Sequence, residues 1–170
     1  DPYEKSDCIE KSMKTHDRVF FIDFGIHVDD NSLAVVFEPN ENMHVIVFPA
    51  VMDGIDWTMF KDKVKSGSAE PTRQMGLHFD TDVSSCISEN YYNVKSTRAK
   101  TWLMMCKPTL KHMKCRRTGD AKIHPKSVTM FEKFKENGVK IAAYTAANIV
   151  ITYTHECVGN ILNSAGIKSS

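Results

Sequence analysis

Two similar stretches, Gly25-Ile26-His27-Val28-Asp29-Asp30 and Gly76-Leu77-His78-Phe79-Asp80-Thr81-Asp82, indicate that this chain contains a repeated unit. Both alternate apolar and polar residues, which is the pattern of a half-buried β-strand. Further short matches follow in the same order: Val47-Phe48-Pro49 with Ile123-His124-Pro125, and Thr58-Met59-Phe60 with Thr129-Met130-Phe131. A β-rich unit of this size cannot bury its sheet face alone, so we expect the two copies to share one core.

The repeat predicts an α+β fold class with two pseudo-repeated antiparallel β-rich units, each closed by a helix, plus a C-terminal helix. Residues 1–17 are a polar N-terminal arm, which we expect to be extended or to form a short helix. Residues 18–170 are one domain, made of the two repeats at 18–67 and 75–138 and a C-terminal segment at 141–166. A chain of 170 residues is long enough for one such domain.

The expected elements follow from hydrophobic periodicity and turn residues. Strands are expected at 18–29, with a bend at Gly25, and at 33–38, 43–48, 75–82, 99–106, 110–115 and 121–124. Helices are expected at 57–65 and 127–137, because Trp57, Phe60 and Val64 share one face of the first and Val128, Phe131 and Phe134 recur in the second. The segment 141–165 combines β-branched residues with helical spacing and is assigned to a helix.

The charge of the chain is strongly uneven along the sequence, although its total is only +1. Residues 1–94 hold eight Lys and Arg against seventeen Asp and Glu, a net charge of −9. Residues 95–126 hold ten Lys and Arg against one Asp, a net charge of +9. A near-neutral total therefore does not exclude a polyanionic partner.

The basic block predicts a surface that binds single-stranded DNA or RNA without catalysis. Tyr91, Tyr92 and Trp102 are interleaved with its cations, and strand alternation places Lys100 beside Trp102. Single-strand binders combine such a cationic groove with aromatic faces on which bases stack. The predicted site, at 95–122, consists of Lys95, Arg98, Lys100, Trp102, Lys107, Lys111, Lys114, Arg116, Arg117 and Lys122.

The layout of the chain resembles the Whirly family of single-stranded-nucleic-acid-binding proteins. The resemblance rests on two tandem ββββα units over residues 18–165 and on the pattern of Pro49, Trp57 and Phe60 with Pro125, Val128 and Phe131. It implies nucleic-acid binding by curved sheet surfaces, often with further oligomerisation.

A metal-dependent enzyme is the first alternative. His27 and Asp29, and likewise His78 and Asp80, are two residues apart and so share one side of a strand. Two such pairs can form one metal site between the repeats, because imidazole and carboxylate together suit Mn, Fe or Zn. The same alternation is also that of the polar face of an ordinary strand.

A protein-interaction module is the second alternative, in which the acidic and basic halves of neighbouring copies meet in a homo-oligomer. Salt would then weaken self-association, whereas for nucleic-acid binding it would weaken the complex.

The remaining expectations come from residue content. Five cysteines at wide spacings without a Cys-x-x-Cys motif disfavour a disulfide scaffold, which favours an intracellular location and leaves secretion open. No apolar run is long enough to cross a membrane, so no membrane partner is expected. No cofactor is expected either, since no phosphate-binding loop or dinucleotide fingerprint occurs.

Overall fold

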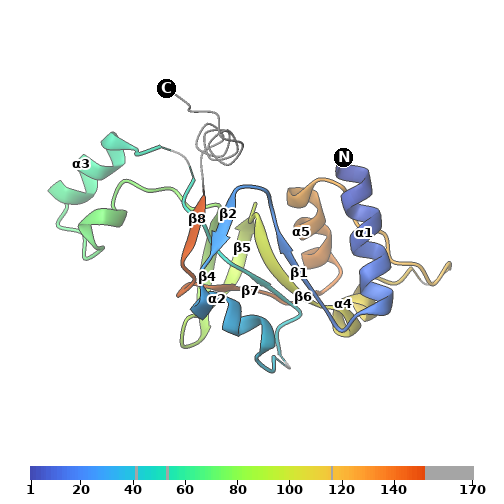
Figure 1. Cartoon of the computed structure of the whole chain (residues 1–170). Helices are drawn as coiled ribbons and strands as arrows, with labels where there is room; N and C mark the ends of the chain where they lie inside the picture. The colour runs from blue at the N-terminus through green and yellow to red at the C-terminus, as the bar shows by residue number, and fades with distance from the viewer. Residues whose placement is uncertain (41, 53, 116, 152–170) are drawn as a thin grey trace, which may run out of the picture.

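One six-stranded mixed sheet forms the centre of the fold (Figure 1). The computed structural model of the chain describes residues 1–40, 42–52, 54–115 and 117–151. The strands lie in the order β1-β6-β3-β7-β5-β4, with these bounds: β1 Arg18–Ile22, β3 Val45–Val47, β4 Thr81–Ser88, β5 Tyr91–Thr97, β6 Thr101–Met105 and β7 Ile141–Tyr144. β3 and β7 are parallel, and the other neighbours in the sheet are antiparallel.

Helices cover both faces of this sheet. α1 (Pro2–Thr15), α4 (Cys106–Met113) and α5 (Ser127–Glu136) pack on one face, whereas α2 (Asp30–Ala34) and the short helix η1 (Val35–Phe37) lie over the other. β2 (Ile26–Val28) and β8 (Ile149–Ile151) pair separately, and α3 (Trp57–Lys65) projects away from the sheet, followed by η2 (Thr72–Gln74) (Figure 1). The predicted α+β class is confirmed.

β6 is buried along its whole length, because all five of its residues are at most 6% exposed. Trp102 and Met104 face the layer of α1, α4 and α5, while Leu103 and Met105 face the opposite layer. The Trp102 ring stacks on Phe21 at 5.1 Å between ring centroids and meets Phe131 edge-on at 6.2 Å. Both hydrophobic clusters of the core therefore meet at this strand.

Two predicted strands are helices. Residues 33–37 belong to α2 and η1, because the Asp29 side chain accepts a hydrogen bond from the Ser32 amide at 3.1 Å and caps a helix there. Residues 110–115 lie mostly in α4, which begins directly after β6. Pro108 falls in the first turn of α4, where its missing N–H is not needed.

Three other element predictions are also wrong. The helix predicted over 141–165 is instead β7 and β8 as far as residue 151, because residues 141–144 fill the space between β3 and β5; the rest of that prediction, with the C-terminal helix, lies outside the described residues. The strand predicted at 75–82 begins only at Thr81. Residues 121–124 contribute only a single bridge, between Lys114 and Ala121.

The N-terminal segment is a packed helix rather than an arm. α1 begins at an Asp1 cap, since the Asp1 side chain accepts from the Tyr3 amide at 2.9 Å. Ile9 and Met13 are buried against the main core cluster. The polar composition of this segment therefore reflects only its outer face.

The helices of the two predicted repeats are placed differently. α5 buries Met130, Phe131 and Phe134 in the core, whereas α3 has no buried residue. Trp57, on the apolar face predicted for α3, is 61% exposed. The matching sequence patterns thus occupy different environments within one sheet-centred fold.

We expect Trp102→Ala to lower the free energy of unfolding by about 3–5 kcal/mol, because it leaves a large cavity beside Phe21 and Phe131. Trp57→Ala is the matched control and should change it by about 0.5 kcal/mol or less, as for a surface substitution. Urea unfolding followed by far-UV circular dichroism measures both. Equal losses for the two variants would contradict this description of the core.

Candidate nucleic-acid interface

The structure distributes the predicted basic site over three places instead of one β surface. Trp102 was expected to offer its ring to bases, but it is 1% exposed and packed between Phe21 and Phe131, so it cannot stack on a ligand. This part of the prediction is wrong, because strand β6 is covered on both faces.

The first group of cations lies on β5 and on the connection from β5 to β6. Lys95, Arg98 and Lys100 are all exposed. Lys95 and Arg98 line a cavity between the β4–β5 hairpin and α5. These side chains therefore have carboxylates of other elements around them, which a polyanion-binding surface would avoid.

The second group is a stripe along α4. Lys107 and Lys111 are four residues apart and share one face of α4, and Lys114, three residues further on, caps the C-terminal end of the helix. All three lysines are exposed. A rise of about 1.5 Å per residue spreads the stripe over about 10 Å. The other face of α4 points into the core, with Cys106 and Thr109 buried and Leu110 and Met113 packed on the main cluster.

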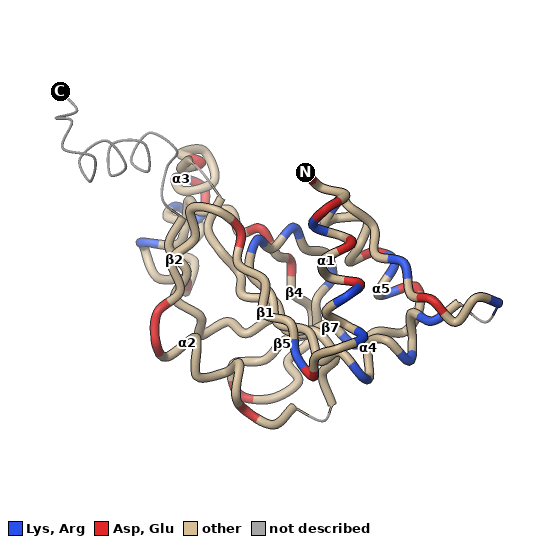
Figure 2. Tube along the Cα trace, turned by 45° about the vertical axis from the view of Figure 1, so that its right-hand side comes forward, with Lys and Arg blue, Asp and Glu red and all other residues tan. Residues whose placement is uncertain are grey.

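The third group lies on the loop after α4, which projects from the molecule (Figure 2). Arg117 and Lys122 are exposed there, whereas Arg116 lies outside the described residues. Backbone hydrogen bonds close the loop, from the Cys115 amide to the Asp120 carbonyl and from the Gly119 amide to the Cys115 carbonyl, both at 2.9 Å. Amide hydrogen bonds from Thr118 and Arg117 lower the pKa of the exposed Cys115 thiol.

Two ion pairs connect the acidic N-terminal part of the chain to the basic segment. Lys107 Nζ lies 3.0 Å from Asp17 Oδ1, and Lys14 Nζ lies 3.1 Å from Asp120 Oδ1. Such exposed pairs contribute about 0–1 kcal/mol, so a phosphate can displace them. Across the part of the chain that the structure describes, Lys111, Lys114, Arg117 and Lys122 form no ion pair, and their charges are available to an anion.

The segment that carries the cations of α4 and its loop, residues 103–130, contains no Phe, Tyr or Trp. Tyr91 and Tyr92 are partly buried on β5, and Tyr91 contacts Tyr144 at 5.2 Å between ring centroids. The cations of α4 and the loop therefore have no neighbouring platform for base stacking in their own segment.

A histidine pair links α4, which carries His112, to the start of β3, which follows His44. The rings of His44 and His112 lie 4.8 Å apart, and the His112 Nδ1 lies 3.1 Å from the Asn137 carbonyl. His44 Nδ1 accepts the Lys140 amide at 3.1 Å, so this nitrogen carries no proton. Burial, and then the charges of His112 and Lys140, lower the pKa of His44.

The residues of the metal alternative have separate structural roles. Asp29 caps α2, His78 Nε2 lies 3.2 Å from Asp56 Oδ2, and Asp80 is buried with its Oδ1 on the Ala50 amide at 3.1 Å. His27 is exposed on β2. No group of three or more His, Cys, Asp or Glu side chains is placed to hold a metal ion among residues 1–40, 42–52, 54–115 and 117–151.

The comparisons with known proteins add no family. No family model, no curated protein and no solved structure matches the chain. The likeness to the Whirly family stays a prediction. Within the described ranges, no helix is long and apolar enough to cross a membrane.

Sequence reasoning missed the histidine pair and the surface of α4 as a helix face. The spacing of Lys107, Lys111 and Lys114 is a signal that could have revealed that face, since it matches the helical repeat. His44 and His112 are 68 residues apart along the chain, and no local pattern joins them.

The lowered pKa of His44 predicts that acid destabilises the fold. Below its ordinary pKa of about 6.5, the unfolded chain binds a proton at His44 that the folded chain resists, so the free energy of unfolding falls as pH falls. His44→Asn, which keeps an acceptor for the Lys140 amide, should reduce this loss between about pH 7.5 and about pH 5.5. Urea unfolding at several pH values measures it. His27→Asn, at an exposed position, is the control, and an equal reduction in both variants would contradict the assignment.

Proposed function

We propose that this protein binds the phosphate backbone of nucleic acid without catalysis, through the stripe on α4 and the loop that follows it. The residues are Lys107, Lys111, Lys114, Arg117 and Lys122. The single observation that carries the proposal is that Lys107 and Lys111 share one exposed face of a helix whose opposite face is fixed in the core, with exposed Lys114 as the capping residue at its C-terminal end.

A rigidly held row of cations suits a regular row of phosphates. α4 follows β6 without a connecting loop, and one of its faces packs on the core. The opposite face, which carries the lysines, therefore points outward. Lys111 and His112 also lie in the last helical turn, where cations are favoured by the helix dipole, so part of this charge serves helix stability. Lys107, near the other end of the helix, gains nothing from the dipole, and its charge is left for Asp17 or for a phosphate.

The mode of binding is contact with phosphates and not stacking on bases. Since residues 103–130 offer no aromatic ring and Trp102 is buried, the surface does not distinguish bases. Binding of this type is sequence-independent and depends strongly on salt, because each phosphate contact releases a counterion. Single-stranded and double-stranded nucleic acid both present the required phosphates.

The triple variant Lys107→Gln, Lys111→Gln, Lys114→Gln should weaken oligonucleotide binding, because it removes the stripe. It should also reduce the slope of log affinity against log salt by about two to three, at roughly 0.9 for each lost contact with duplex DNA. Fluorescence anisotropy with a labelled duplex and a labelled single strand, over a series of salt concentrations, measures both quantities.

The matched control removes the same charge from another helix. Lys61→Gln, Lys63→Gln, Lys65→Gln changes three lysines of α3 and should leave the salt slope unchanged. Trp102→Phe, which keeps an aromatic core residue, should leave the affinity unchanged as well. An equal effect of the two triple variants, or no oligonucleotide binding by the native chain at low salt, would refute the proposal.

A further inference from the structure

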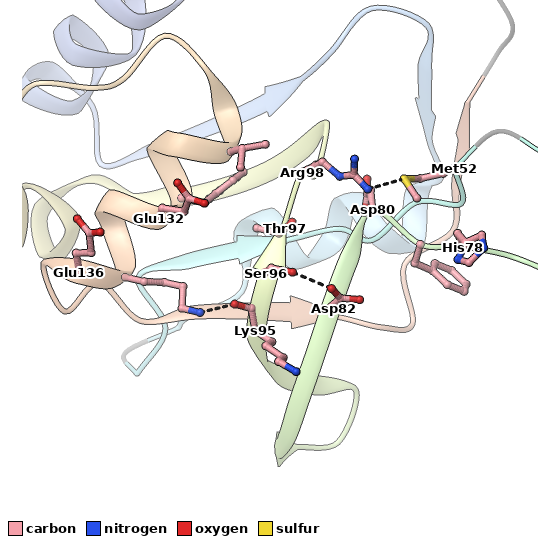
Figure 3. A pocket seen from close by; sticks show the side chains of 14 residues that line it. Met52, His78, Asp80, Asp82, Lys95, Ser96, Thr97, Arg98, Glu132 and Glu136 are labelled. Atoms are coloured by element: carbon pink, nitrogen blue, oxygen red, sulfur yellow. Dashed lines mark hydrogen bonds between the residues drawn. The ribbon is translucent and has the colours of Figure 1, made fainter.

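A second feature with ligand chemistry is a cavity of about 640 Å³ between α5 and the β4–β5 hairpin (Figure 3). Four apolar residues contribute to its lining: Met52, Phe79, Val128 and Phe131. Charged side chains line it from two directions, with Glu132 and Glu136 on α5 and Asp80 and Asp82 on the side of β4. The cavity thus combines an apolar surface with carboxylates on separate elements.

Asp80 is the unusual member of this lining. The residue is only 8% exposed. Its Oδ1 accepts hydrogen bonds from the Ala50 amide at 3.1 Å and from Thr81 Oγ1 at 2.9 Å. Its Oδ2 is buried and has no hydrogen-bond partner in the described structure. Burial raises the pKa of this carboxyl, while hydrogen bonds from Ala50, Thr81 and the Lys100 amide and the charge of Lys100 act in the lowering direction. An unpaired buried carboxylate oxygen is costly, and a ligand that donates a hydrogen bond to it removes the cost.

Two of the three Lys and Arg side chains that line the cavity, Lys135 and Arg98, are attached to neutral acceptors, and the third, Lys95, is exposed. Lys135 Nζ donates to the Lys95 carbonyl, and Arg98 Nη2 lies 3.3 Å from the Met52 sulfur, a weak acceptor. Among the described residues, Asp80, Asp82, Glu132 and Glu136 take part in no ion pair. Asp82 instead accepts a hydrogen bond from Ser96 Oγ at 2.8 Å. His78, which lines the cavity, pairs with Asp56, a residue that does not line it. The carboxylates therefore remain open to a cationic ligand.

The arrangement of these carboxylates selects a linear cation over a metal ion. The described side chains hold no cluster of three or more metal-ligating groups, so no three acids of the cavity converge on one point. Negative groups on two sides of an apolar lining instead match a molecule with ammonium groups at its ends and methylenes between them.

We propose that this cavity binds an aliphatic diamine or polyamine. One ammonium donates to Asp80 Oδ2, a second lies against Glu132 and Glu136, and the methylenes pack on Val128 and Phe131. Because Asp80 Oδ2 is shielded from solvent, the ammonium reaches it only when a neighbouring side chain moves. Arg98 is the candidate, since it is exposed, its amide bonds the Asp80 carbonyl at 2.7 Å, and only a thioether holds its guanidinium. This inference does not rest on the nucleic-acid proposal.

Isothermal titration of the full chain with putrescine and with spermidine at low salt tests the site. The double variant Glu132→Gln, Glu136→Gln, at exposed positions, should weaken binding by roughly tenfold or more, as expected for loss of a charge-assisted hydrogen bond. Asp80→Asn, which keeps the Oδ1 acceptor, should weaken it likewise, and Arg98→Gln should strengthen it. Glu4→Gln, Glu89→Gln is the matched control outside the cavity and should bind as the native chain does.

Three results would overturn the site. The first is no binding of either amine by the native chain. The second is an equal loss in the cavity double variant and in its control. The third is displacement of the amine by Mg²⁺ added at a concentration equal to that of the amine. Such displacement would mean that the amine binds through general surface charge, for which a compact divalent ion competes equally well. If Asp80→Asn does not fold, its circular dichroism shows it, and the Glu132→Gln, Glu136→Gln double variant alone then tests the site.

Discussion

The fold depends on the burial of β6 on both faces. A strand in this position must be covered on two sides. The layer of α1, α4 and α5 covers Trp102 and Met104, and the layer that contains η1 covers Leu103 and Met105. The chain leaves β6 directly into α4, which fixes the direction and the rotation of that helix. The outward face of α4, with its lysines, is therefore a consequence of the core. A change that loosens β6 is expected to disturb the lysine stripe even though no lysine is altered.

Much of the fold could be predicted wherever local pattern and tertiary environment agree. β3, β6, α3 and α5 all fall within or close to their predicted ranges, because alternation, helical spacing and capping residues are local signals. The predictions failed where two local signals compete. Val35, Val36 and Phe37 favour a strand by propensity, but the Asp29 cap starts a helix just before them. Strands were predicted up to residue 106 and from residue 110, although Cys106, Thr109, Leu110 and Met113 recur at helical spacing and lie in α4.

The candidate site could be predicted in its charge but not in its geometry. The basic block was visible in the sequence, and its cations are exposed wherever the structure describes them. Their separation into a helix stripe, a loop and a cavity wall depends on contacts between distant residues. Asp17 pairs with Lys107, and Lys95 and Arg98 line a cavity together with residues of α5. The spacing of residues along the sequence does not reveal these contacts. The burial of Trp102 is the clearest case, since a lone tryptophan in a strand can point either way until its covering layer is known.

The central claim, that nucleic acid lies on α4 and its following loop, is tested most directly by protection of a thiol already present there. Cys115 is exposed and directly follows Lys114 at the start of the loop that carries Arg117. Cys8 on α1 and Cys86 on β4 are also exposed, outside the proposed binding surface. Iodoacetamide alkylation of the native chain, quantified for each cysteine by mass spectrometry with and without saturating duplex DNA, compares the three in one sample. We expect slower alkylation of Cys115 in the complex and an unchanged rate at Cys86. Protection of Cys86 with Cys115 left reactive would contradict it.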